Sequence, residues 1–183
     1  RLAVGFVLVR RNCMSAGRIQ IDVVDGSILE VEADAIVNAA NSRGIMGGGV
    51  AGVIKRAAGL EVDEEARRQA PIPVGSAVLT SGGRTRFKGI IHAPTMPEPG
   101  MRIEPGNVAL ATRAALALAD TQSFTSIAIP GMGTGVGGVA HTEAAARMIK
   151  EIKAYSARTL RLVILVDVDS AMVQAWRECL AGS

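Results

Sequence analysis

Short apolar runs alternate with stretches of helical periodicity along most of the chain. Runs that are apolar, or that alternate apolar and polar positions, predict strands. Strands are expected at residues 2–9, 17–24, 35–38, 76–81, 89–92, 126–130 and 160–168. Apolar residues recur with the spacing of one helix face at residues 50–58, 62–69, 107–120 and 142–155, and Ser170 is expected to cap a last helix.

This order of elements predicts the fold class. Strands that alternate with helices favour a three-layer α/β/α domain with a mixed sheet. Residues 160–168 show almost no alternation, which is typical of a strand covered on both faces. Residues 2–9 and 17–24 are expected to pair near an edge of the sheet, and residues 94–106, which contain four prolines, to form an irregular loop. At 183 residues the chain is expected to be a single domain.

Two glycine-rich loops each come directly after a predicted apolar strand. The first contains Gly47-Gly48-Gly49 ahead of the helix at 50–58, and the second, at 130–139, follows the strand at 126–130. Glycine lets a ligand approach the backbone, and the amide groups at a helix N-terminus attract an anion. Ligands of such folds bind beyond the carboxyl ends of the strands. The two loops are therefore expected to face one crevice and to hold a ligand with two phosphates.

The common nucleotide-binding motifs do not fit these loops. No GxxxxGK[ST] motif is present, which disfavours a nucleoside triphosphatase. Residues 133–138 match GxGxxG in form. A dinucleotide fingerprint also needs a helix that begins within the motif and an acidic residue about 20 positions further on, and Asp167 is more distant. A dinucleotide-binding domain therefore stays a remote alternative.

Composition narrows the classes of partner. The 20 basic and 17 acidic side chains are scattered, and three Phe, one Tyr and one Trp offer few platforms for stacking on bases, so nucleic-acid binding is only weakly supported. Cys13 and Cys179 lack the spacing of metal ligands, which predicts no metal site, no disulfide and a reducing, cytoplasmic location. Residues 2–9 are too short to cross a bilayer and lack the features of a secretory signal, so no membrane association is expected.

The sequence around the glycine loops resembles the macro domain family. The resemblance is carried by DAIVNAANSRGIMGGGVAGVIKRAAG at 34–59, GIIHA at 89–93 and SIAIPGMGTGVGGVAHTEAA at 126–145. Order and spacing agree from about Ile19 to the C-terminus. Residues 1–18 lie outside most of the resemblance and are expected to add an N-terminal strand and turn to a single macro domain.

The resemblance implies a protein that binds ADP-ribose or its derivatives, either free or attached to proteins, without a cofactor. It implies that main-chain N–H groups of the two loops clasp the diphosphate, which agrees with the ability of amide nests to hold phosphate without a lysine. Asn41 would contact the distal ribose and is the candidate catalytic residue. The predicted ligand-binding residues are Gly26, Ser27, Ile28, Ala39, Asn41, Gly47, Gly48, Gly49, Val50, Pro130, Gly133, Thr134, Gly135, Val136, Gly137 and Val168.

Four positions depart from the family pattern. Ser27 stands where an aspartate usually recognises the adenine amino group, and Asp25 is the nearest substitute. Val168 and Gly137 stand where aromatic residues pack on adenine and border the distal ribose. Stacking on an aromatic is worth about 1–3 kcal/mol, so adenine binding is expected to be weakened tenfold or more. Ala51 replaces an acidic residue that would position water in many hydrolytic members.

These observations predict that the protein is mainly a binding module and that any hydrolysis is secondary. Weak hydrolysis of ADP-ribosyl esters or ADP-ribose-1''-phosphate is compatible with water oriented by Asn41 and by the phosphate of the substrate. The expected partners are ADP-ribose and mono-ADP-ribosylated proteins, and the alternative is a nucleotide- or RNA-binding module without hydrolase activity. Asn38 is expected to stabilise a turn, His92 to lie at the edge of the core, and His141 to belong to a helix-capping segment.

Overall fold

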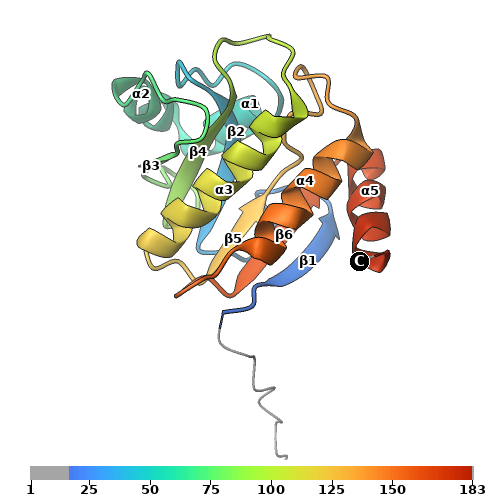
Figure 1. The fold of residues 1–183 in the computed structure, drawn as a ribbon. Helices are drawn as coiled ribbons and strands as arrows, with labels where there is room; N and C mark the ends of the chain where they lie inside the picture. Colours follow the sequence, from blue (N-terminus) through green and yellow to red (C-terminus); the bar gives the residue numbers. More distant parts are fainter. Residues whose placement is uncertain (1–16, 183) are drawn as a thin grey trace, which may run out of the picture.

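The computed structural model describes residues 17–182 as a six-stranded sheet with helices on both faces (Figure 1). The predicted strand at 2–9 lies outside these residues. The strands are β1 (Gln20–Asp25), β2 (Ala35–Asn41), β3 (Val78–Thr80), β4 (Gly89–Met96), β5 (Ser126–Ile129) and β6 (Leu162–Asp167). The helices are α1 (Gly49–Ala58), α2 (Leu60–Arg68), α3 (Pro105–Thr121), α4 (His141–Ala154) and α5 (Ser170–Ala181).

The strand order is β1-β6-β5-β2-β4-β3, and every pair is parallel except β3 with β4. Alternate side chains of the central strands enter two apolar cores. Ile36 and Ile90 pack with residues of α1 and α2 on one face, whereas Val37 and Ile91 pack with residues of α3, α4 and α5 on the other. This arrangement confirms the predicted three-layer α/β/α fold with a mixed sheet, in which β1 occupies an edge (Figure 1).

Three predicted boundaries of these elements were wrong. The predicted loop at 94–106 begins late, because β4 continues to Met96 in register with Asn41 of β2. Helix α3 begins at Pro105, two residues before the predicted start of this helix. Asp169, and not Ser170, caps α5: its side chain accepts a hydrogen bond from the Ala171 N–H. None of the helices in residues 17–182 is long and apolar enough to span a membrane.

The pairing of β2 is uneven along its length. Its registered pairing with β5 covers only Ala35 with Ile127 and Ile36 with Ala128, whereas its pairing with β4 continues to Asn41. The carboxyl half of β2 therefore has no registered partner on its β5 side. The sheet opens at this point, between the ends from which the two glycine loops leave.

Asp34 fixes the amino ends of the central strands. Its carboxylate accepts hydrogen bonds from the Thr125 N–H and hydroxyl, at 2.8 and 2.9 Å, and forms an ion pair with Lys88. Burial raises the pKa of Asp34, but the hydrogen bonds from Lys88 and Thr125 outweigh it and bring the pKa to about 2. The segments that lead into β2, β4 and β5 are thus held at one carboxylate.

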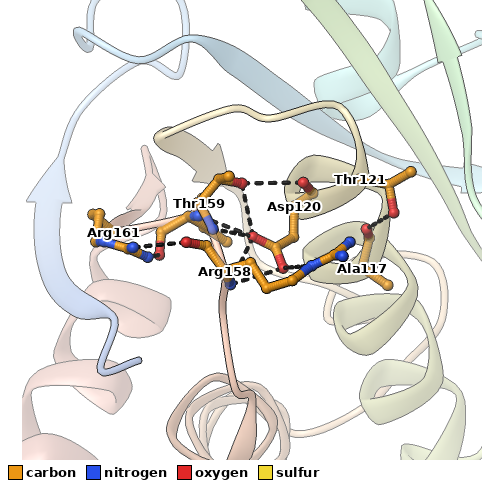
Figure 2. A network of polar contacts seen from close by, with 7 residues as sticks. Ala117, Asp120, Thr121, Arg158, Thr159 and Arg161 are labelled. Atoms are coloured by element: carbon orange, nitrogen blue, oxygen red, sulfur yellow. Dashed lines mark hydrogen bonds and ion pairs between the residues drawn. The ribbon is translucent and has the colours of Figure 1, made fainter. Parts of the chain in front are cut away.

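Asp120 makes a corresponding link between the end of α3 and the start of β6 (Figure 2). Its carboxylate accepts hydrogen bonds from the backbone N–H groups of Arg158, Thr159 and Leu160, the shortest of which measures 2.6 Å. The Thr159 hydroxyl donates to the same carboxylate at 2.8 Å. Burial raises the pKa of Asp120, and these donors lower it by more, to well below its usual range.

Replacement of Asp120 is expected to destabilise the fold. Asp120→Ala leaves the N–H groups of residues 158–160, which lead into β6, without their acceptor and should lower the free energy of unfolding by about 2–4 kcal/mol in urea denaturation. Thr121→Ala is the matched control, because this exposed hydroxyl donates only to the Ala117 carbonyl of its own helix. The control should change stability by less than about 0.5 kcal/mol. Equal effects of the two substitutions would contradict the linking role of Asp120.

A buried polar chain joins β2, β4 and β3. Asn38 Nδ2 lies 3.2 Å from His92 Nδ1, and His92 Nε2 lies 3.0 Å from the Thr80 hydroxyl. His92 is fully buried, so it belongs to the core and not to the core edge. Burial lowers the pKa of His92 to about 4, against smaller opposing effects of Glu65 and Asp63.

This histidine predicts a loss of stability in mild acid. In the unfolded chain His92 binds a proton below its ordinary pKa of 6.5, whereas the folded protein resists protonation down to about 4. The free energy of unfolding should therefore fall by about 2 kcal/mol between about pH 7.5 and about pH 5. His92→Gln should flatten this decline, and His141→Gln, which changes a partly exposed histidine, should retain it. A decline that is unchanged in His92→Gln would refute the assignment.

Candidate functional site

A cavity of about 870 Å³ lies beyond the carboxyl ends of β2, β5 and β6, between the two glycine loops. Every residue predicted to bind ligand lines this cavity, from Gly26 at one end through the two loops to Val168. The structure thus brings together segments that are more than a hundred residues apart in the sequence. Their contacts with a ligand stay predictions.

The Asn41 side chain holds the first glycine loop in its turn. Its Oδ1 accepts hydrogen bonds from the N–H groups of Arg43 at 3.1 Å and Ile45 at 3.3 Å, and its Nδ2 donates to the Ile45 carbonyl at 2.9 Å. Asn41 is therefore the turn-forming residue here, while Asn38 is buried against His92. Asn41 also lines the cavity, so one side chain shapes the loop and borders the site.

The glycine triplet forms the start of α1. Gly48 is the N-cap residue and offers no side-chain cap, and Gly49 has a φ of 56°, a left-handed conformation that glycine adopts without strain. The first backbone N–H groups of α1 have no partner within the helix. Because no acidic residue stands in the first turn and the glycines are exposed, these amides and the positive end of the helix dipole are available to an anion.

The second glycine loop closes on itself. The Val139 N–H donates to the Gly133 carbonyl at 3.0 Å, and the Gly138 N–H donates to the Gly135 carbonyl at 3.1 Å. The next helix, α4, begins only at His141, beyond the GxGxxG residues, which is unlike a dinucleotide-binding fingerprint. A Cβ atom on Gly137 would lie 2.6 Å from the Gly133 carbonyl oxygen, so this loop has no room for the aromatic residue that the family often carries there.

The proline-rich segment between β4 and α3 connects the two loops. Its Glu98 forms an ion pair with Arg43 of the first loop at 2.8 Å, and the Ile103 N–H donates to the Gly137 carbonyl of the second at 3.0 Å. Pro99 and Gly100 of the segment line the cavity, as do Thr95 and Met96 at the end of β4. These lining residues were not predicted, because only the four prolines marked the segment in the sequence.

The end of the cavity predicted for adenine is built from the ends of β1 and β6. Ser27 lines it, and its hydroxyl accepts a hydrogen bond from the Leu29 N–H at 3.2 Å. Val168 is 76% exposed at the rim. Asp25 is not among the lining residues, but Asp167 is; its carboxylate accepts hydrogen bonds from the N–H groups of Gly131 and Asp169, both at 2.9 Å.

A polar pair of His141 and Asp169 at the adenine end of the cavity was not predicted. His141 Nε2 lies 2.8 Å from Asp169 Oδ2, and both residues line the cavity. Hydrogen bonds from His141 and from the Ala171 N–H hold the pKa of Asp169 below its ordinary value. The expected capping role of the His141 segment was wrong, because Ala140 is the N-cap of α4 and makes no side-chain cap. His141 instead connects α4 to the capping residue of α5.

Comparison with known proteins gives this architecture a family. The macro domain model matches residues 37–148, so the chain belongs to the macro domain family. A protein of Aquifex aeolicus is 60% identical over 87% of this chain and 97% of its own length, and one of Aeropyrum pernix is 47% identical over 84% and 82%.

Solved macrodomains have the same fold. A mutant of the Oceanobacillus iheyensis macrodomain with ADPR superposes with a TM-score of 0.81 at 27% identity, covering 92% of this chain and 95% of that one. The Trypanosoma brucei macrodomain in complex with ADP-ribose gives 0.79 at 26% identity, covering 87% and 68%. The family and these complexes support ADP-ribose binding as the general function of the fold.

The packing of the second loop makes a prediction about two of its glycines. Gly137→Ala would force the backbone apart at Gly133 and should lower the free energy of unfolding by about 1–3 kcal/mol in chemical denaturation. Gly135→Ala is the control, because a Cβ atom there has no heavy atom within 4 Å and its φ is not positive. It should change stability by less than about 0.5 kcal/mol. A harmless Gly137→Ala would show that the loop is not packed as described.

Proposed function

We propose that this protein binds ADP-ribose or ADP-ribosyl groups on proteins in the cavity between the two glycine loops, and that it is a reader of these groups first. One observation carries the proposal: both loops leave the carboxyl ends of neighbouring parallel strands and line the same cavity of about 870 Å³. A cavity of this volume is in the range that encloses a molecule of cofactor size.

The proposed diphosphate position lies between the N-terminus of α1 and the second loop. Exposed Gly47, Gly48 and Gly49 offer backbone N–H groups on one side, and Thr134 and Gly135 border the other. No lysine lines this cavity, and Arg56 is the one arginine among its lining residues. The diphosphate would therefore be held mainly by amide groups and the helix dipole, as in other backbone anion sites.

The proposed adenine end lies beside Ile28, Ser27 and Val168. The only carboxylates among the lining residues are Asp167 and Asp169. Asp169 is engaged by His141, so Asp167, and not Asp25, is our candidate to accept a hydrogen bond from the adenine amino group in place of the aspartate that Ser27 replaces. Each of its oxygens accepts one backbone N–H and retains a second lone pair.

The residues proposed to lie near the distal ribose offer little means of activating water for hydrolysis. Ala51, which is almost fully buried, stands where a carboxylate could activate water, and both lining carboxylates come from the β6 end of the cavity. Asn41 is left to orient water together with the phosphate of the substrate. Any hydrolysis of ADP-ribosyl esters or ADP-ribose-1''-phosphate is therefore expected to be slow.

Calorimetric titration tests this function. ADP-ribose should bind at least about tenfold more tightly than AMP, which lacks the second phosphate and the distal ribose.

Gly135→Asp should weaken the binding of ADP-ribose about tenfold relative to Gly135→Asn, which adds the same volume without charge. Replacing adenine by hypoxanthine should also weaken binding if Asp167 reads the amino group. If a poly(A) oligonucleotide gives a heat of binding and ADP-ribose gives none, this proposal is wrong and the nucleotide- or RNA-binding alternative holds.

Incubation with mono-ADP-ribosylated protein separates a reader from a hydrolase. Release of ADP-ribose that disappears in Asn41→Ala would support slow hydrolysis. Because Asn41 also holds the first loop, the variant must retain the wild-type unfolding midpoint for this result to count. No release at high protein concentration leaves the protein a reader only.

A further inference from the structure

A second, smaller cavity of about 410 Å³ lies on the other side of the first glycine loop, between α1, α2 and the loop before β4. Four basic side chains line it: Lys55 and Arg56 from α1, Arg67 from α2, and Arg84. We call it the basic cleft. Neither an acidic nor an aromatic residue is among its lining residues.

One buried carboxylate positions half of these cations. Asp63 lies beneath the basic cleft with its side chain 7% exposed, and forms ion pairs with Lys55 at 3.1 Å and Arg67 at 3.0 Å. It also accepts a hydrogen bond from the Met46 N–H at 2.9 Å. Burial raises the pKa of Asp63, and these donors together lower it by more, so the carboxylate stays charged and holds both cations in place.

The other two cations, Arg56 and Arg84, have no such partner. Within residues 17–182 no carboxylate lies within ion-pair distance of either guanidinium group, although a Glu61 carboxylate oxygen and Arg84 Nε both lie within 3.5 Å of the position of a Cβ atom on Gly59. The only hydrogen bond between them is a long one, 3.4 Å, from Arg84 Nη2 to the Arg56 carbonyl. The basic cleft therefore has more positive charge than its own carboxylates neutralise.

Arg56 places this charge next to the larger cavity. A Cβ atom on Gly52 would lie 3.3 Å from Arg56 Nη1 and 3.1 Å from the Gly47 carbonyl oxygen, so the guanidinium lies back along α1 toward the glycine loop. Arg56, Gly47 and Ile45 line both cavities. A ligand that extends past the first glycine loop would meet the basic cleft directly.

We propose that the basic cleft is a second anion site, which takes a phosphate group carried by the ligand beyond its distal ribose. This inference rests on the proposed function in that the ligand reaches the basic cleft from the larger cavity. Guanidinium groups bind phosphate through paired charge-assisted hydrogen bonds, and a phosphate with two charges matches two arginines that lack carboxylate partners. The absence of aromatic residues from the lining disfavours a nucleic-acid strand, which would need surfaces for its bases.

The test compares ADP-ribose with ADP-ribose-1''-phosphate by calorimetry, with product analysis to confirm that the ligand stays intact. The phosphorylated ligand should bind about tenfold more tightly. Arg84→Gln should reduce this preference to about twofold and leave the affinity for ADP-ribose unchanged, because Arg84 lines only the basic cleft. Arg68→Gln is the control, since this exposed arginine of α2 lines neither cavity, and it should keep the preference.

Three results would overturn the inference: equal affinity for the two ligands, a preference that survives Arg84→Gln, or an equal loss in Arg68→Gln, which would indicate only a general charge effect. If ADP-ribose itself fails to bind, the proposed function fails, and inorganic pyrophosphate still tests the basic cleft by amide chemical shifts. Shifts at Gly47 and Gly52 that Arg84→Gln abolishes would support a phosphate site, and their absence would reject it. Stronger Arg84-dependent shifts with a glutamate-rich peptide would assign the cleft to acidic protein segments.

Discussion

The site depends on how far β2 pairs with β5. These parallel neighbours are in register for only two residue pairs, whereas β2 stays paired with β4 to its end. The helices that follow the two loops also cover opposite faces of the sheet, α1 on one face and α4 on the other, and ligands of such folds bind where neighbouring loops separate in this way. Because the pairing stops halfway, the chain after Ile36 and the chain after Ala128 separate, and the larger cavity opens between them. Asp34 holds the amino ends of β2 and β5 together, so the opening is confined to the carboxyl ends of these strands.

Polar contacts fix the loops on both sides of the opening. Asn41 fixes the first loop with three hydrogen bonds of its amide, and the second loop bonds to itself. The segment after β4 connects them through Arg43 with Glu98 and through the Ile103 N–H. The ion pair is half exposed, so its energy is small, and its effect is on the placement of the loops. Amides that are already fixed in place lose little further entropy when an anion binds.

Local patterns predicted what local physics determines. The apolar central strands, the helix that ends at Gly59 and the two glycine loops were predicted because their signals lie within a few residues. The continuation of β4 through Pro94 could not be predicted, since it depends on pairing with β2. The contact of Asp169 with His141 and the contact of Asp167 with Gly131 likewise depend on segments brought together by folding. The class of ligand was predicted from the resemblance to the macro domain family, because hydrophobic periodicity predicts helices and strands but not ligands.

The four departures from the family pattern affect different parts of the site unequally. The amide groups of the two loops come from the backbone, so the frame proposed for the diphosphate persists whichever side chains surround it. Recognition of the base and activation of water depend on side chains, and Ser27, Val168 and Ala51 alter those. Gly137 is different, because its lack of a side chain is required by the tight turn at Gly133. Under the proposed function, selection of a ligand would depend on side chains next to this frame, and Asp167 and Arg56 both line the larger cavity.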